Sequence, residues 1–134
     1  MEDTIDWITR NSDGREQVQY YKDTNTLLLI SVRDAGELVS FVNEITPEDV
    51  RSVSVKSSEG SWQNLNLNLK HGGTMVLYYT LDKNFEIIGE VKNIRQYGIS
   101  ISFNCSQSMI LKFKKAYIHL FQLLGVDVKD GDMF

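Results

Sequence analysis

The stretch Asn64-Leu65-Asn66-Leu67-Asn68-Leu69 carries the clearest secondary-structure signal in this chain of 134 residues. Successive side chains of a β-strand point to opposite faces of a sheet, so the three leucines share one face and the three asparagines share the other. A leucine face needs an apolar layer to cover it, whereas an asparagine face is compatible with water. The stretch therefore predicts a strand in a sheet with one covered face and one wet face.

The same period of two continues on both sides of this stretch. Val53 and Val55 alternate with polar residues before it, and β-favouring runs follow at 74–81, 85–92 and 99–103. Residues with turn chemistry separate these runs at 70–73, 82–84 and 93–98. We therefore expect an antiparallel meander of about five strands in this part of the chain.

The first third of the chain predicts a helix and a hairpin. Residues 1–14 are interpreted as a short helix ended by Gly14, or as a loosely held segment. Two β-favouring runs follow at 16–22 and 26–32, and the turn residues 23–25 join them.

The next segment has helical spacing. Asp34 precedes Glu37 by three residues, as in a capping box. After it, apolar residues recur every three or four positions, as on one face of a helix: Leu38, Phe41, Val42 and Ile45. We therefore expect a helix over 34–45, with at most one further helical turn after Pro47.

The C-terminal part predicts a long helix. Ser106 is a capping residue, and about nineteen residues separate it from Gly125, which suits the left-handed position after a helix. The main apolar face of this helix includes Phe113, Tyr117 and Phe121. Leu111 and Ile118 form a second, smaller apolar strip, which is covered by another part of the chain or by another molecule. Residues 127–134 are expected to be a frayed tail.

Together these elements predict one α+β domain over residues 1–134. We expect an antiparallel sheet of about six or seven strands, with the long C-terminal helix and a shorter helix packed on one face. The composition, 42% hydrophobic and 24% charged, is that of an ordinary globular domain.

Charge and cysteine content indicate the compartment and the kinds of partner. Cys105 is the single cysteine, and the acidic N-terminus resembles neither a secretory signal nor a membrane anchor, so we expect a cytoplasmic protein without a membrane partner. Residues 1–50 hold eleven acids against four bases, and residues 51–134 hold seven against ten. The formal net charge of −4 disfavours nucleic acid as a partner.

No common catalytic motif is present. The sequence lacks a Gly-x-Ser-x-Gly elbow, a phosphate-binding Gly-x-x-x-x-Gly-Lys loop, a dinucleotide fingerprint and a His-Glu-x-x-His pair. The acidic segment 127–132 does not continue to the glutamate that a calcium loop requires. We therefore assign no catalytic residue, cofactor or metal, and we lean against an enzyme without excluding one that has an uncommon constellation.

The leading hypothesis is a non-catalytic protein-binding module, such as a small acidic inhibitor, an immunity-type protein or an adaptor, with self-association as an open option. Its partner surface is assigned to acids before the alternating strands, to the asparagine row and to the second helical strip: Glu44, Glu48, Asp49, Asn64, Asn66, Asn68, Leu111 and Ile118. The alternative is a small-ligand-binding domain with a cavity between the C-terminal helix and the sheet, lined by Phe113, Tyr117 and Phe121.

Overall fold

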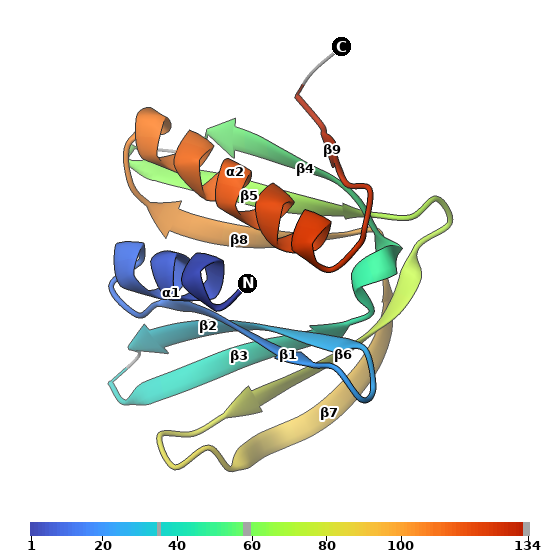
Figure 1. Ribbon diagram of the computed structural model, residues 1–134. Coiled ribbons are helices and arrows are strands. Elements are labelled where there is room, and N and C mark those ends of the chain that lie inside the picture. The colour runs from blue at the N-terminus through green and yellow to red at the C-terminus, as the bar shows by residue number, and fades with distance from the viewer. Residues whose placement is uncertain (35, 58–59, 133–134) are drawn as a thin grey trace.

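The computed structural model describes residues 1–34, 36–57 and 60–132, which form two helices, nine strands and one 3-10 turn (Figure 1). In chain order the elements are α1 (Glu2–Asn11), β1 (Glu16–Tyr21), β2 (Thr26–Asp34), β3 (Leu38–Ile45), the 3-10 turn η1 (Pro47–Asp49), β4 (Val50–Ser57), β5 (Trp62–Leu69), β6 (Thr74–Leu81), β7 (Ile87–Gln96), β8 (Gly98–Asn104), α2 (Gln107–Leu123) and β9 (Lys129–Asp130). The α+β class, the first helix, the first hairpin and the single turn after Pro47 are confirmed.

The strands form two sheets, not the one sheet of six or seven strands that we expected. The first sheet is antiparallel, in the order β1-β2-β3-β6-β7, and the second has the order β8-β5-β4-β9. The second sheet is mixed because β9 runs parallel to β4. The chain changes sheet between β3 and β4, between β5 and β6, and between β7 and β8. A period of two shows that residues lie in a strand, but it does not show which sheet the strand joins.

The turn expected at 93–98 is one of these changes of sheet. Residues 93–96 continue β7, and the chain bends only at Tyr97 before β8 begins. The carbonyl of Tyr97 accepts a hydrogen bond of 3.0 Å from the amide of Leu69, at the end of β5. This bond joins the point where the chain leaves the second sheet after β5 to the point where it enters that sheet again at β8.

The prediction of a helix over 34–45 is wrong. Asp34 is the last residue of β2, and residues 38–45 form the strand β3. Residue 35 lies outside the described residues. β3 pairs with β2 on one side and with β6 on the other. Leu38 and Val42 point to one face of the sheet, and Phe41 and Ile45 point to the other. A central strand with apolar residues on both faces reproduces the spacing of a helical stripe, so the sequence pattern is ambiguous here.

Both helices contribute to the core, together with the inner faces of both sheets (Figure 1). Leu65 and Leu67 of β5 are fully buried, as are Ile8 of α1 and Leu120 of α2. Burying a leucine side chain stabilises the fold by about 1.5–3 kcal/mol, so the β5 leucines anchor the second sheet to the helices. The shorter helix that packs here is α1. None of the helices among the described residues has the length and apolarity to cross a bilayer.

α2 begins where the sequence predicts and ends earlier. The Oγ of Ser106 accepts a hydrogen bond of 3.1 Å from the amide of Met109, which confirms the N-cap. The helix has 17 residues and stops at Leu123, so it is only of moderate length. Gly125 has φ +80° and reverses the chain after it.

The segment expected to fray after α2 is docked as far as residue 132. Val128 is buried, and β9 pairs with β4. The Nζ of Lys114 lies 3.0 Å from a carboxylate oxygen of Asp130 and 3.2 Å from one of Asp132. Asp132 also accepts a hydrogen bond of 3.0 Å from the amide of Val55. A local charge pattern does not reveal this docking, because Lys114 reaches the acids from a different element. Residues 133 and 134 lie outside the described residues.

Candidate functional site

The outer face of the first sheet, which is turned away from the helices, holds an apolar groove. Its cavity volume is about 670 Å³. The lining comes from all five strands of the sheet and from the β6–β7 turn: Gln17, Gln19, Tyr21, Leu28, Ile30, Val32, Leu38, Ser40, Val42, Glu44, Leu77, Tyr79, Leu81, Asp82, Lys83, Phe85, Ile87 and Val91.

The groove exists because the central strands of this sheet are apolar on both faces. In β2, Leu27 and Leu29 point into the core, whereas Leu28, Ile30 and Val32 point into the groove. Val42 of β3 is fully buried although it is not part of the core cluster around the helices. A strand with two apolar faces is typical of a sheet that is covered on both sides. The unbroken apolar run 27–30 is the signal that could have predicted this face.

β7 has an irregular register where it borders the groove. Tyr78 pairs with Lys92, and Thr80 pairs with Ile88, so three residues of β7 lie opposite Tyr79 alone. Gly89, within this bulge, has φ +79°, which favours glycine. A bulge bends its strand and increases the local twist, and in Figure 1 β7 is strongly curved. The curvature makes the outer face concave instead of flat.

Exposed apolar side chains surround the groove. Phe85, in the β6–β7 turn, is 77% exposed, and Leu38 and Ile87 are each 53% exposed. Phe85 has φ +63°, a backbone conformation that is unusual for a large side chain. The Asp82 side chain holds this turn, because its Oδ1 accepts hydrogen bonds from the amides of Asn84 (2.8 Å) and Glu86 (3.0 Å). The turn therefore presents an aromatic ring to solvent at the edge of the groove.

Two polar side chains on the groove lining are neighbours. Glu44 of β3 and Tyr79 of β6 point to the same face on adjacent strands, since Glu44 is opposite Leu77 and Val42 is opposite Tyr79. Burial and the nearby Glu44 carboxylate raise the pKa of the Tyr79 hydroxyl, so Tyr79 stays protonated at neutral pH. Glu44 itself is half-buried.

The three acids assigned to a partner surface do not lie together. Glu44 lines the groove. Glu48 is exposed beside the first hairpin, where its Oε2 accepts a hydrogen bond of 2.7 Å from Asn25. Asp49 forms an ion pair of 2.9 Å with Lys70 and accepts a hydrogen bond of 2.8 Å from Thr74, so it connects η1 to the β5–β6 turn.

The asparagine row lies on the outer face of the second sheet. Asn64, Asn66 and Asn68 are half-buried, and the leucines between them face the core. Asn68 donates hydrogen bonds to the hydroxyls of Ser52 (3.0 Å) and Ser54 (3.1 Å), and Asn64 accepts one of 2.9 Å from Ser102. This face is a polar surface on which the exposed Lys56 lies opposite Asn64, and it belongs to a different sheet from the groove.

The α2 residues divide between core and surface. Leu111 is 45% exposed, whereas Ile118 packs partly against the core. Phe113, Tyr117 and Phe121, assigned to a ligand cavity, are buried to 1% exposure or less. The Phe113 ring stacks on Phe103 at a centroid distance of 4.2 Å and also lines a small hollow of about 160 Å³.

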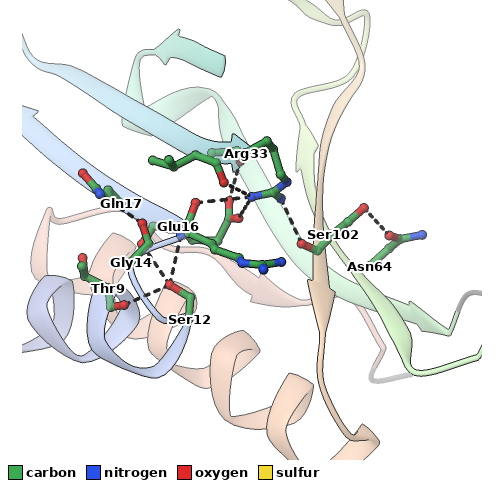
Figure 2. A network of polar contacts seen from close by, with 11 residues as sticks. Thr9, Ser12, Gly14, Glu16, Gln17, Arg33, Asn64 and Ser102 are labelled. Carbon is green, nitrogen blue, oxygen red and sulfur yellow. Dashed lines mark hydrogen bonds and ion pairs between the residues drawn. The ribbon is translucent and has the colours of Figure 1, made fainter. Parts of the chain in front are cut away.

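This small hollow is next to a buried polar cluster (Figure 2). The Glu16 carboxylate is nearly inaccessible, accepts a hydrogen bond from Ser31, and lies 2.8 Å from Nη1 of Arg33. Nη2 of Arg33 donates to the Ser102 carbonyl at 3.2 Å, so Arg33 connects β2 of the first sheet to β8 of the second. Burial raises the pKa of Glu16, although Ser31 and Arg33 oppose the shift.

Cys105 also lines the small hollow, and burial raises the pKa of its thiol. A raised pKa lowers the fraction of thiolate, which is the nucleophilic form. The Cys105 thiol is therefore poorly suited to act as a nucleophile. The neighbouring pair of Glu16 and Arg33 connects the two sheets.

Within residues 1–34, 36–57 and 60–132, no three His, Cys, Asp or Glu side chains come together as a metal site. Comparisons with protein-family models, with curated proteins and with solved structures give no match to this chain.

Proposed function

We propose that this chain is a non-catalytic protein-binding module, and that its groove receives an apolar segment of the partner. The observation that supports this proposal is the apolar outer face of the first sheet, with its hollow of about 670 Å³. Contiguous exposed apolar surface is rare on a protein that acts alone, and it commonly marks an interaction site. An inhibitor, an immunity-type protein or an adaptor would each use such a surface.

The exposed residues at the edge of the groove favour a protein partner. Tyr21, Leu38, Phe85 and Ile87 are all more than half exposed. Aromatic side chains such as Tyr21 and Phe85 are enriched in protein interfaces and often contribute much of the binding energy once a partner buries them, and the aliphatic side chains beside them extend the apolar contact. A cytoplasmic location fits the single cysteine.

The test is native mass spectrometry of the tagged chain purified from its own cells. We expect a heavier heteromeric species with the wild-type chain and its loss in the double variant Leu38→Lys/Ile87→Lys, which places two charges at the groove. Leu111→Lys is the matched variant, because Leu111 has a similar exposure on α2. A heteromer that survives the groove substitutions and disappears with Leu111→Lys would move the partner surface to α2 and contradict the proposal.

A small-ligand-binding domain is the second candidate function. The groove volume lies within the range of about 300–1,000 Å³ that is usual for small-molecule sites. In this case the same spectrum would show a bound species of a few hundred daltons in place of a protein, and the groove substitutions would remove it.

A further inference from the structure

Glu44 is a carboxylate in apolar surroundings. On the sheet it is opposite Leu28 of β2 and Leu77 of β6, and both leucines line the groove with it. Within the described part of the chain, Glu44 forms no ion pair. Lys83 also lines the groove, but it is not within ion-pair distance of Glu44.

Covering this carboxylate with a purely apolar partner would be unfavourable. A charged group that loses water without gaining a partner of opposite charge is strongly penalised. Tyr79 reduces this penalty, because its protonated hydroxyl lies beside the carboxylate, but it supplies no positive charge. An occupant with a cationic group satisfies the charge, whereas an occupant with a carboxylate adds repulsion.

We infer that Glu44 and Tyr79 select an occupant with a Lys or Arg side chain among bulky apolar ones, contributed by a segment of a partner protein. This inference rests on the proposed function. The apolar side chains of the segment would cover Leu28, Leu77 and the exposed edge of the groove, and its cation would meet Glu44. Arg suits the site because a guanidinium donates several hydrogen bonds in one plane, which matches a carboxylate next to a hydroxyl.

The exposed surface extends further than a small amine can cover. Met75, which lies on the same face of β6 as Leu77, is 48% exposed, and Val91 of β7 is also 48% exposed. Phe85 is at the opposite end of the β6–β7 hairpin from Met75. A peptide segment can contact both ends at once, and therefore a protein is the occupant to which we commit.

The first experiment measures charge selection with three probes of equal chain length: octylammonium, octanol and octanoate. Binding is followed by amide chemical shifts of β2, β3 and β6 at low ionic strength. We expect octylammonium to bind the wild-type chain about five- to tenfold more tightly than octanol, an effect of the size of one charge-assisted contact, and octanoate to bind most weakly. The variant Glu44→Gln should lose the preference for the amine while it still binds octanol.

Glu48→Gln is the matched control, because Glu48 is an exposed carboxylate within η1, close to β3 in the chain but outside the groove. It should retain the preference. Equal binding of the amine and the alcohol by the wild-type chain, or an unchanged preference in Glu44→Gln, would overturn the inference and leave the groove as an apolar site. Failure of all three probes to shift the groove residues would count against the proposed function itself.

The second experiment tests the commitment to a protein segment. Two amphipathic peptides of leucine and glutamine are compared, one with a single central arginine and one with glutamate at that position. We expect the arginine peptide to bind about tenfold more tightly than the glutamate peptide, and to shift the amides near Phe85 and Met75 together. A chain that binds octylammonium but neither peptide would show a site for small amphiphilic amines and would overturn the assignment of a protein occupant.

Discussion

The outer faces of the two sheets differ in chemistry, although their inner faces share one core. The second sheet presents serines and asparagines that are hydrogen-bonded to one another, whereas the first sheet presents a groove of leucine, isoleucine and valine side chains. The same contrast is visible in single strands. β5 alternates asparagine and leucine from Asn64 to Leu69, and β2 contains four consecutive apolar residues, Leu27 to Ile30. Inner faces build the fold in both sheets, and only the first sheet has a second apolar face that folding leaves uncovered.

The contrast between inner and outer apolar faces predicts the largest effect on stability. Leu67→Ala removes a fully buried side chain and should lower the free energy of unfolding by about 2–5 kcal/mol. Leu38→Ala removes a side chain that is 53% exposed at the groove and should cost well under half as much. Urea denaturation of both variants measures the difference. Equal losses would mean that the groove is part of the folding core.

The buried pair of Glu16 and Arg33, which connects the two sheets, predicts an effect on stability of intermediate size that depends on pH. The pKa of Glu16 is raised from 4.5, so the folded protein holds this proton more tightly than the unfolded chain. The resulting stabilisation is present below pH 4.5 and is lost as the pH rises through the pKa of Glu16 in the folded protein. Wild type should therefore lose stability relative to Glu16→Gln over this interval, as measured by urea denaturation at a series of pH values.

Ser31→Ala sharpens the test of Glu16. The Ser31 hydroxyl donates a hydrogen bond to the Glu16 carboxylate and lowers its pKa. Removing this donor should raise the pKa further and strengthen the pH dependence. A pH profile that is the same in wild type, Ser31→Ala and Glu16→Gln would contradict the assignment.

The polar outer face predicts the smallest effects. Asn66 makes no side-chain hydrogen bond within the described residues, and Asn68 makes two, to Ser52 and Ser54. Asn66→Thr should be neutral or stabilise by up to about 0.5 kcal/mol, because threonine suits a strand better than asparagine. Asn68→Thr should destabilise by about 1 kcal/mol through lost hydrogen bonds. Thermal unfolding of the pair distinguishes them, and the reverse order would indicate that Asn66 has a partner.

Much of the candidate site was not predictable from local pattern. The sequence groups Glu44 and Asp49 in one acidic segment. In the structure Glu44 lies in the groove, whereas Asp49 forms an ion pair with Lys70 and a hydrogen bond with Thr74. The groove residues of β3 and β6 become neighbours only because these strands pair across more than thirty positions in the chain. The spacing of Leu38 and Val42 also fits one face of a helix, because a strand that is apolar on both faces has no distinctive period.

Local chemistry by itself determined the elements whose cause lies within a few residues: the alternating strand at 64–69, the Ser106 cap, the reversal at Gly125 and the first hairpin. Tertiary structure decided the rest. The division into two sheets, the docking of residues 128–132 by Lys114 and the apolar groove all depend on contacts between distant segments. The physical reason is that side-chain alternation follows from the geometry of one strand, whereas pairing and burial are settled by competition among all strands for the same apolar surface.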